Sequence, residues 1–359
     1  MVRMVTILFT IHCPLFTVYA QQSWTLDDCL HYARDHNIHL REQTIEVELS
    51  RNKLNTVKND WMPTVDISAA QQFNFGNATA SQGFIGEEAY NVDLSHTSGS
   101  LNVEIPVFDG FKRRNRQHAA EWSVHQAVAS LEHARRNLDI QVATYYLQVL
   151  YEQGMTEVAT TQVETSRRLC EKTRALVDDG KKAQSDLADV ESKQASDEYR
   201  LTVCKSRADM ALLALAQLLN LPAKEDFRVV PLDDDILQDN ELPDASALYA
   251  EASDSHPAIG AAQATVEKSR YDVGAARADY FPRLEFKASL NTYYYNPFHS
   301  PTSGPLFSEF WRNKSGLIGL HLTIPVFNHF ITRNNIRRAK MLYDQSQLRL
   351  SDTRQRLQK

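Results

Sequence analysis

The chain repeats itself at an offset of 219 residues, and this duplication constrains the fold more than any other feature. Ile105-Pro106-Val107-Phe108 recurs unchanged as Ile324-Pro325-Val326-Phe327, and Asp60-Trp61-Met62-Pro63 recurs as Asp279-Tyr280-Phe281-Pro282. Further identities keep the same offset without a gap, which indicates two structurally equivalent units. The sequence therefore predicts a first structural repeat over residues 21–222, a linker over 223–244 and a second repeat over 245–359.

Each repeat contains two segments in which apolar and polar residues alternate, a pattern typical of β-strands with one apolar face. The predicted strands are residues 64–75 and 99–108 in the first repeat, and 283–295 and 316–327 in the second. Strands of about ten residues suit a tilted membrane barrel. A soluble antiparallel sheet with one wet face would alternate in the same way. The duplication, the strand length and an export signal together favour the barrel.

The segment that follows the first strand pair contains no proline between Pro106 and Pro222 and predicts a helical hairpin over residues 111–221. Phe111 to Val177 would form one helix on the order of 100 Å long, and Gly180 would supply the left-handed cap of the turn. Apolar residues keep a three-four spacing typical of coiled coils: Leu131, Ala134, Leu138, Val142, Tyr145 and Val149 before the turn, and Leu201, Cys204, Ala208, Leu212, Leu215 and Leu219 after it. A shorter helix is expected from Trp24 to Asp60 with a break near His36 and Asn37, and Ile38, Ile45, Leu49 and Val57 carry its helical spacing.

Residues 1–20 are predicted to be a secretory signal peptide. Arg3 supplies the positive charge, a mostly apolar stretch follows, and Val18-Tyr19-Ala20 resembles a cleavage site. Three cysteines remain after this segment, so they cannot all pair and no disulfide framework is expected. The net charge of −6 is mild and gives no reason to expect nucleic-acid binding.

These features resemble the TolC-type outer-membrane efflux protein family over essentially all of the chain after residue 20. The specific marks are the repeated Ile-Pro-Val-Phe before a helix, the Trp/Tyr-x-Pro before a strand, Val177-Asp178-Asp179-Gly180 followed by Ser185-Asp186-Leu187, and the run from Ala214 to Pro222. The resemblance implies an α+β membrane protein. Long α-helical coiled-coil hairpins would form a periplasmic tunnel, and a homotrimer would contribute four transmembrane β-strands per subunit to one 12-stranded β-barrel in outer-membrane lipid.

The resemblance also implies a function and partners. The expected function is passive export of cargo that an inner-membrane pump and a periplasmic adaptor (membrane fusion) protein deliver, as in tripartite efflux or type I secretion. We expect no enzymatic activity, no cofactor and no metal, because no Gly-rich phosphate loop, zinc spacing or nucleophile elbow is present. The residues expected to line the pore are Asp66, Glu104, Arg283, Glu285 and Lys287, and those expected to dock the adaptor at the hairpin tip are Val177, Asp178, Asp179, Gly180, Lys181 and Asp186.

One departure from the family pattern leaves alternatives open. Residue 359 aligns with Ile140, so the second repeat lacks counterparts of Gln141 to about Leu221, the family's second helical hairpin. The sequence is either incomplete or naturally truncated. The alternative functions are a non-conducting fragment and a periplasmic coiled-coil interaction protein with a small sheet and no pore. The basic cluster of Lys112, Arg113, Arg114 and Arg116 is interpreted as a solvated helix face.

Overall fold

The computed structural model describes residues 23–75, 77–78, 90–91, 94–221, 227–232, 244, 249, 252, 255–297 and 304–358. The predicted signal peptide, most of the linker and parts of both long loops between paired strands lie outside these ranges. The chain divides into two compact units, one of residues 1–43 and 132–242, the other of residues 44–131 and 243–359. This division differs from the predicted repeats because the long helix α3 (Lys112–Asp178) contributes residues to both units.

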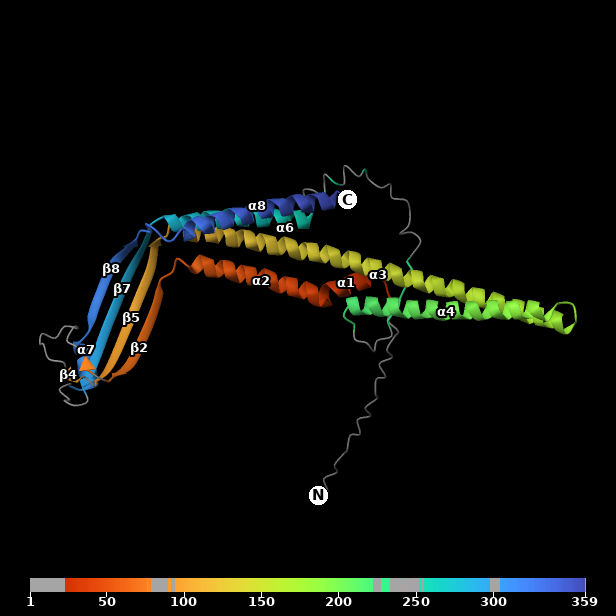
Figure 1. The fold of residues 1–359 in the computed structure, drawn as a ribbon, viewed down its shortest axis with the longest axis horizontal. Coiled ribbons are helices and arrows are strands. Elements are labelled where there is room, and N and C mark those ends of the chain that lie inside the picture. The colour runs from red at the N-terminus through yellow and green to blue at the C-terminus, as the bar shows by residue number, and fades with distance from the viewer. Residues whose placement is uncertain are drawn as a thin grey trace, which may run out of the picture. The chain divides into compact units, whose positions relative to one another are not determined.

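The second unit contains a four-stranded antiparallel sheet in the order β2-β5-β7-β8 (Figure 1). Its strands are β2 (Thr64–Asn74), β5 (Leu94–Phe108), β7 (Arg283–Pro297) and β8 (Ser315–Thr323). Strand β5 begins five residues earlier than the sequence pattern indicates, because residues 94–98 still lie opposite β2. Strand β8 ends four residues earlier than predicted, since β7 begins at Arg283, opposite Thr323, and offers no partner beyond it.

The strand register repeats with the offset found in the sequence. Thr64 lies opposite Glu104 in the β2–β5 ladder, and Arg283 lies opposite Thr323 in the β7–β8 ladder. Each residue of the second pair follows its counterpart in the first by 219 positions. The duplication is therefore present in the backbone pairing as well as in the residues.

In both repeats the chain passes from the sheet into the next helix through the same strained turn. Gly110 and Phe111 have φ angles of 68° and 66°, and their counterparts His329 and Phe330 have φ angles of 54° and 60°. Two consecutive left-handed residues turn the chain sharply from the strand into the following helix. The helices that begin there are α3 and α8 (Ile331–Leu357), again at equivalent positions.

The helices before the sheet are equivalent too. In the first repeat α1 (Leu26–His36) and α2 (Ile38–Asn59) are separated by Asn37, where the sequence predicts a break. In the second repeat α6 (Pro257–Arg277) begins after His256, the counterpart of Asn37, which caps the helix through its side chain. The short helix η2 (Ala278–Tyr280) then leads into β7.

The buried face of α1 and α2 differs from the predicted one. Ala33, Leu40 and Val47 recur every seven residues and are 1%, 4% and 5% exposed. Ile38, Ile45 and Leu49 lie on another face and are more than half exposed. The segment is helical as predicted, but it carries two apolar stripes. Only the stripe of Ala33, Leu40 and Val47 is buried.

The first unit is built on the hairpin of α3 and α4 (Gln184–Leu218), with β1 (Ser23–Trp24) and β6 (Arg228–Val229) paired in parallel beside it. Leu138, Val142 and Val149 of the predicted seam are buried, as are Cys204, Leu215 and Leu219 of the seam on α4. The prediction is wrong for Tyr145, because the seam passes through Tyr146, which is 1% exposed. The Tyr146 hydroxyl donates to the carbonyl oxygens of Trp24 and Val230 at 3.2 and 2.5 Å.

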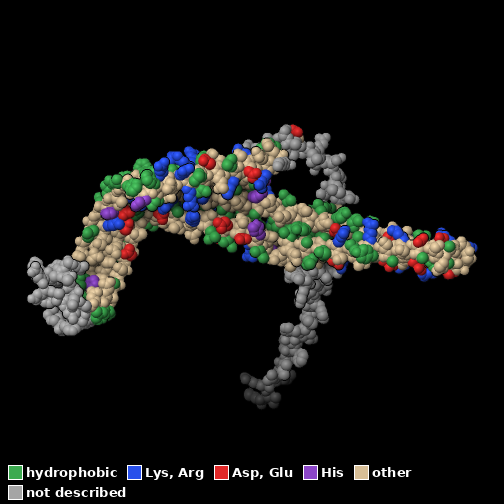
Figure 2. Space-filling view, viewed as in Figure 1, with side chains coloured by type: hydrophobic (Ala, Val, Ile, Leu, Met, Phe, Trp, Pro, Cys, Tyr) green, Lys and Arg blue, Asp and Glu red, His purple; other side chains and the backbone are tan. Residues whose placement is uncertain are grey.

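The remaining elements are small. Helix α7 (Leu306–Arg312) lies between β7 and β8 in the chain, and β3 (Asn77–Ala78) pairs with β4 (Tyr90–Asn91). Figure 2 shows a group of Lys and Arg side chains over the helices next to the sheet, where α8 alone contributes Arg333, Arg337, Arg338, Lys340, Arg349, Arg354 and Arg356. None of the helices within the described ranges has the length and apolar character needed to cross a membrane.

Candidate functional site

The residues predicted to line a pore share one face of the sheet. Glu104 lies opposite Lys287, whose ammonium nitrogen is 3.6 Å from a Glu104 carboxylate oxygen and 3.0 Å from one of Glu285. Asp66 lies on the same face, where its carboxylate accepts from the Asn102 side-chain nitrogen at 2.9 Å. The structure thus places Asp66, Glu104, Glu285 and Lys287 on one polar face that spans three strands, in two separate groups of contacts; this set is called the charged ladder.

The fifth residue of this predicted set, Arg283, lies at the first position of β7 on the same face. Its guanidinium donates to Asp279 at 3.0 Å rather than to the ladder. Asp279 also pairs with Lys112 at 2.6 Å, so Arg283 belongs to a cluster at the boundary between sheet and helices. Its role as a lining residue stays a prediction.

The opposite face of the sheet is apolar and open. Ile67 of β2 is 82% exposed, and Ile318 and Leu320 of β8 are 78% and 68% exposed. Alternation along antiparallel strands explains why these side chains all lie opposite the charged ladder. An exposed apolar face of this extent requires a covering medium or partner, because soluble monomers rarely expose large contiguous apolar patches.

A clamp at the junction between strands and helices is not apparent from the sequence pattern. Arg113 is 5% exposed and is therefore not on a solvated helix face. Its guanidinium donates to the Asp109 carboxylate at 2.9 Å and to the carbonyl oxygens of Asp60 and Pro106 at 3.3 and 3.0 Å. It also lies 4.4 Å from the centroid of the Trp61 ring. One side chain thus holds the end of α2, the end of β5 and the start of α3.

The predicted docking residues form the turn at the tip of the α3–α4 hairpin. Gly180 has φ 75°, as expected for its left-handed cap. The amides of Gly180 and Lys181 donate to the carbonyls of Val177 and Leu176 at 2.9 and 2.8 Å, which is a Schellman motif. Asp178, Asp179, Gly180 and Lys181 are exposed, whereas Val177 and Asp186 are half-buried. The tip is thus a fixed loop that presents charges of both signs.

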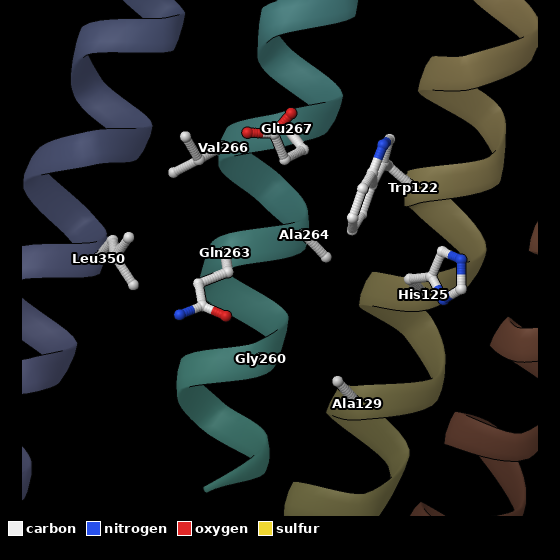
Figure 3. A pocket seen from close by; sticks show the side chains of 9 residues that line it. All are labelled: Trp122, His125, Ala129, Gly260, Gln263, Ala264, Val266, Glu267 and Leu350. Atoms are coloured by element: carbon white, nitrogen blue, oxygen red, sulfur yellow. The ribbon is translucent and has the colours of Figure 1, made fainter. Parts of the chain in front are cut away.

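A groove runs along α3, α6 and α8 in the helical part of the second unit (Figure 3). Trp122, His125 and Ala129 contribute from α3, and Leu350 contributes from α8 on the other side of α6. Small residues meet between α3 and α6, where a Cβ added at Gly260 would be in ordinary van der Waals contact with the Ala129 Cβ at 3.8 Å. No group of three or more His, Cys, Asp or Glu side chains in the described ranges could hold a metal ion.

Comparison with known proteins identifies the class of protein. The chain belongs to the outer membrane efflux protein family, whose family model matches residues 29–221 and 248–359. It is 25% identical over 255 residues to the pyoverdine export outer membrane protein OpmQ of Pseudomonas aeruginosa, covering 69% of this chain and 50% of that protein. It is 23% identical over 256 residues to the outer membrane efflux protein BepC of Brucella suis, covering 70% and 52% respectively. The chain thus spans about half the length of the curated relatives it matches.

Solved structures share the fold at low sequence identity. The Campylobacter jejuni CmeC outer membrane channel superposes with a TM-score of 0.74 and 18% identity, covering 91% of this chain and 67% of that chain. The outer membrane protein VceC of Vibrio cholerae superposes with a TM-score of 0.72 and 15% identity, covering 92% and 75%. The predicted fold class, long helices joined to a small sheet as in the TolC-type channels, is confirmed.

Proposed function

We propose that this chain is the outer-membrane channel subunit of a tripartite efflux or type I secretion system, with its long helices in the periplasm. An inner-membrane pump and a periplasmic adaptor would deliver cargo that the channel conducts passively. The observation that carries the proposal is the two-faced sheet, because a charged ladder opposite an exposed apolar face suits strands between an aqueous lumen and lipid. Family membership supports the same function.

The free edges of the sheet support a homotrimer. Among the described residues, strands β2 and β8 each have one paired neighbour in this sheet. In lipid an open edge leaves backbone groups unpaired at a cost of several kcal/mol each, so the sheet has to close. Four strands cannot close around a channel, whereas three copies supply the twelve strands that the resemblance implies.

The internal duplication predicts the register between neighbouring subunits. The β5–β7 ladder joins the first repeat to the second, with Leu101 opposite Leu290. Shifting each residue by 219 positions toward the other repeat places Leu320 of β8 opposite Gln71 of β2 in the next copy. The same shift places polar-face residues opposite polar-face residues along the whole edge, as a continuous barrel wall requires.

Paired cysteines test this register. We expect Leu320→Cys combined with Gln71→Cys to form an intermolecular disulfide and a covalent trimer, in a background whose native cysteines are replaced by alanine. The matched control, Leu320→Cys with Phe73→Cys, keeps both side chains on the same face but two positions apart. A diagonal pair lies about 7–8 Å apart, too far for a disulfide. Cross-linking of the control pair in preference to the first would refute the predicted register.

Channel function is tested by single-channel recording in planar bilayers. We expect the purified protein to conduct. We expect Lys287→Glu to shift the reversal potential toward cation selectivity, because it makes the net charge of the ladder more negative by two units per subunit. Lys287→Arg, which keeps the charge, is the matched control. A soluble protein that gives no conductance would favour the alternative of a periplasmic coiled-coil interaction protein.

The tip of the hairpin is the proposed adaptor-docking site. Its fixed turn and exposed charges support this role, and Gly180 has open space around it, so a side chain there would change the surface without a clash. We expect Asp178→Lys with Asp179→Lys to weaken copurification of the adaptor while bilayer conductance stays unchanged. The control Glu171→Lys changes an exposed acidic residue on α3 about two turns away from the tip.

A further inference from the structure

Helix α7 roofs a cavity on the apolar face of the sheet. The cavity has a volume of about 470 Å³, within the range of small-molecule sites. Its floor comes from three strands and includes Ile67, Ala69, Leu101 and Leu290, and its roof includes Phe310 and Trp311. Apart from the two serines and Thr292 at the strands, the lining is apolar and aromatic until Lys314 at the rim.

Gly99 in the floor of the cavity leaves room for the Phe310 side chain of the roof. A Cβ added at Gly99 would lie 3.2 Å from two atoms of the Phe310 ring. The Phe310 carbonyl accepts from the Thr292 hydroxyl, and the Asn313 side chain donates to the Tyr293 carbonyl at 3.2 Å, so the C-terminal end of α7 is fastened to β7. The counterpart of Gly99 in the second repeat is Ile318, so the duplicated sequence does not repeat this glycine.

The rim of the cavity carries a cation, Lys314. The Lys314 ammonium lies 5.2 Å from the centroid of the Trp311 ring, and no ion-pair partner for it is found among the described residues. The neighbouring Arg312 is instead paired with Glu309. An apolar chamber with an aromatic wall and a lysine at its mouth is complementary to a molecule with a hydrocarbon chain and an anionic head.

We propose that this cavity binds one acyl chain of an anionic, phosphate-bearing membrane lipid, with Lys314 contacting the phosphate. The inference rests on the proposed function, because the cavity opens on the sheet face assigned to lipid. Continuity supports a lipid occupant: the floor residue Ile67 is 82% exposed, and Phe307 and Trp311 on α7 are 76% and 68% exposed. The bound chain would pass from the surrounding bilayer under α7 without crossing a polar surface.

Quenching of Trp311 fluorescence by brominated lipid tests the proposal. The chain has four tryptophans, and replacing Trp24, Trp61 and Trp122 by phenylalanine leaves Trp311 as the reporter. The protein is placed in nanodiscs that contain either brominated phosphatidylglycerol or brominated phosphatidylcholine as the probe. We expect phosphatidylglycerol to reach half-maximal quenching at a mole fraction about fivefold lower, as one lysine–headgroup contact predicts.

Two variants separate the cavity from the general lipid surface. Lys314→Gln should remove the preference between the lipids, and Ala69→Phe should fill the cavity and reduce quenching by both. Ala288→Phe is the matched control, since Ala288 is the second-repeat counterpart of Ala69 and does not line the cavity. Equal quenching by the two lipids, or an Ala69→Phe variant that behaves like Ala288→Phe, would overturn the lipid site. Conductance of the same samples tests the channel function separately. A protein that conducts but shows no lipid preference would contradict the lipid site alone.

Discussion

Replacing Arg113 by threonine is expected to loosen the junction between the sheet and the long helices. The guanidinium makes one ion pair and two bonds to backbone carbonyls, and it stacks on Trp61. Its side chain is 6% exposed and that of Asp109 is 18% exposed. Removal of the Arg113 side chain therefore leaves the largely buried Asp109 carboxylate with only the backbone amide of residue 113 as a donor, and two carbonyl groups without the guanidinium.

The expected cost follows from these contacts. Removing one partner of a buried ion pair costs about 3–5 kcal/mol, because the other charge remains without compensation. The partial exposure of Asp109 lets water replace some of the lost contact, so we expect about 3 kcal/mol. That corresponds to a local opening equilibrium on the order of 100 times more populated.

The second repeat supplies a matched control. Asn328 and Thr332 occupy the positions of Asp109 and Arg113, and the Asn328 side-chain nitrogen donates to the Thr332 hydroxyl at 2.5 Å. Combining Arg113→Thr with Asp109→Asn converts the charged pair into this neutral one. We expect the double variant to recover at least about 1.5 kcal/mol of the loss, because no buried charge is left unpaired.

Urea unfolding in detergent, followed by Trp61 emission with the other three tryptophans replaced by phenylalanine, measures the loss. Trp61 reports on the junction itself because the guanidinium lies 4.4 Å from its ring. The reasoning would be refuted if the double variant were as unstable as Arg113→Thr alone. A loss below about 1 kcal/mol would refute it as well, since that is the scale of an exposed ion pair.

The remaining predictions concern the helices and linkers. Tyr146→Phe should lower the thermal stability of the first unit by about 1 kcal/mol, because the part-buried Val230 carbonyl loses its hydroxyl donor while the Trp24 carbonyl keeps the Val230 amide; circular dichroism melting measures it. The Lys193 ammonium lowers the pKa of Asp197, so the stability that Asp197 contributes is present above the unfolded value of 3.8 and is lost as pH falls through the lower folded pKa; hydrogen exchange of the hairpin should show this acid loss in the native protein and not in Asp197→Asn. Burial raises the pKa of the Cys29 thiol to about 12, so iodoacetamide at pH 8 should label it roughly a thousandfold more slowly than in urea. Gly110→Ala should destabilise the protein by more than the roughly 1 kcal/mol of a left-handed alanine, because the new Cβ would lie 2.6 Å from the Phe281 Cβ; urea midpoints test it, with His329→Gly as the control expected to stabilise.

The sequence predicted those parts of the fold that depend on local pattern. Alternation along the strands identified which side chains share a face, and the absence of proline identified α3 to within one residue at each end. Gly180 was predicted as a left-handed cap from its position between two helical patterns, and its φ of 75° agrees. Each of these features is determined by residues close together in the chain.

Features that depend on contacts with backbone groups far away in the chain could not be predicted from local sequence pattern. Arg113 stands among other basic residues and looked solvated, because its carbonyl partners belong to Asp60 and Pro106. The available signal was the repeat itself, where Asp109 and Arg113 are replaced together by Asn328 and Thr332. Tyr146 was missed in favour of Tyr145 because periodicity alone does not separate adjacent positions, and the deciding carbonyls come from segments far away in the chain.

The distribution of exposed apolar side chains connects the duplication to assembly. The strand order puts β5 and β7 inside and β2 and β8 at the edges. Within the second unit, the helices joined to the inner strands are α6, whose described residues include no exposed large apolar side chain, and the first part of α3, which has only Val128. The helices joined to the edge strands differ. Helix α2 exposes Ile45 and Leu49, and α8 exposes Ile331, Met341, Leu342 and Leu348. The inner helices α3 and α6 contact each other within one chain, as between His118 and Tyr271. The asymmetry is expected when the contact that covers α3 and α6 within one chain is repeated between α8 of one copy and α2 of the next, which is the same relation that the strand register predicts.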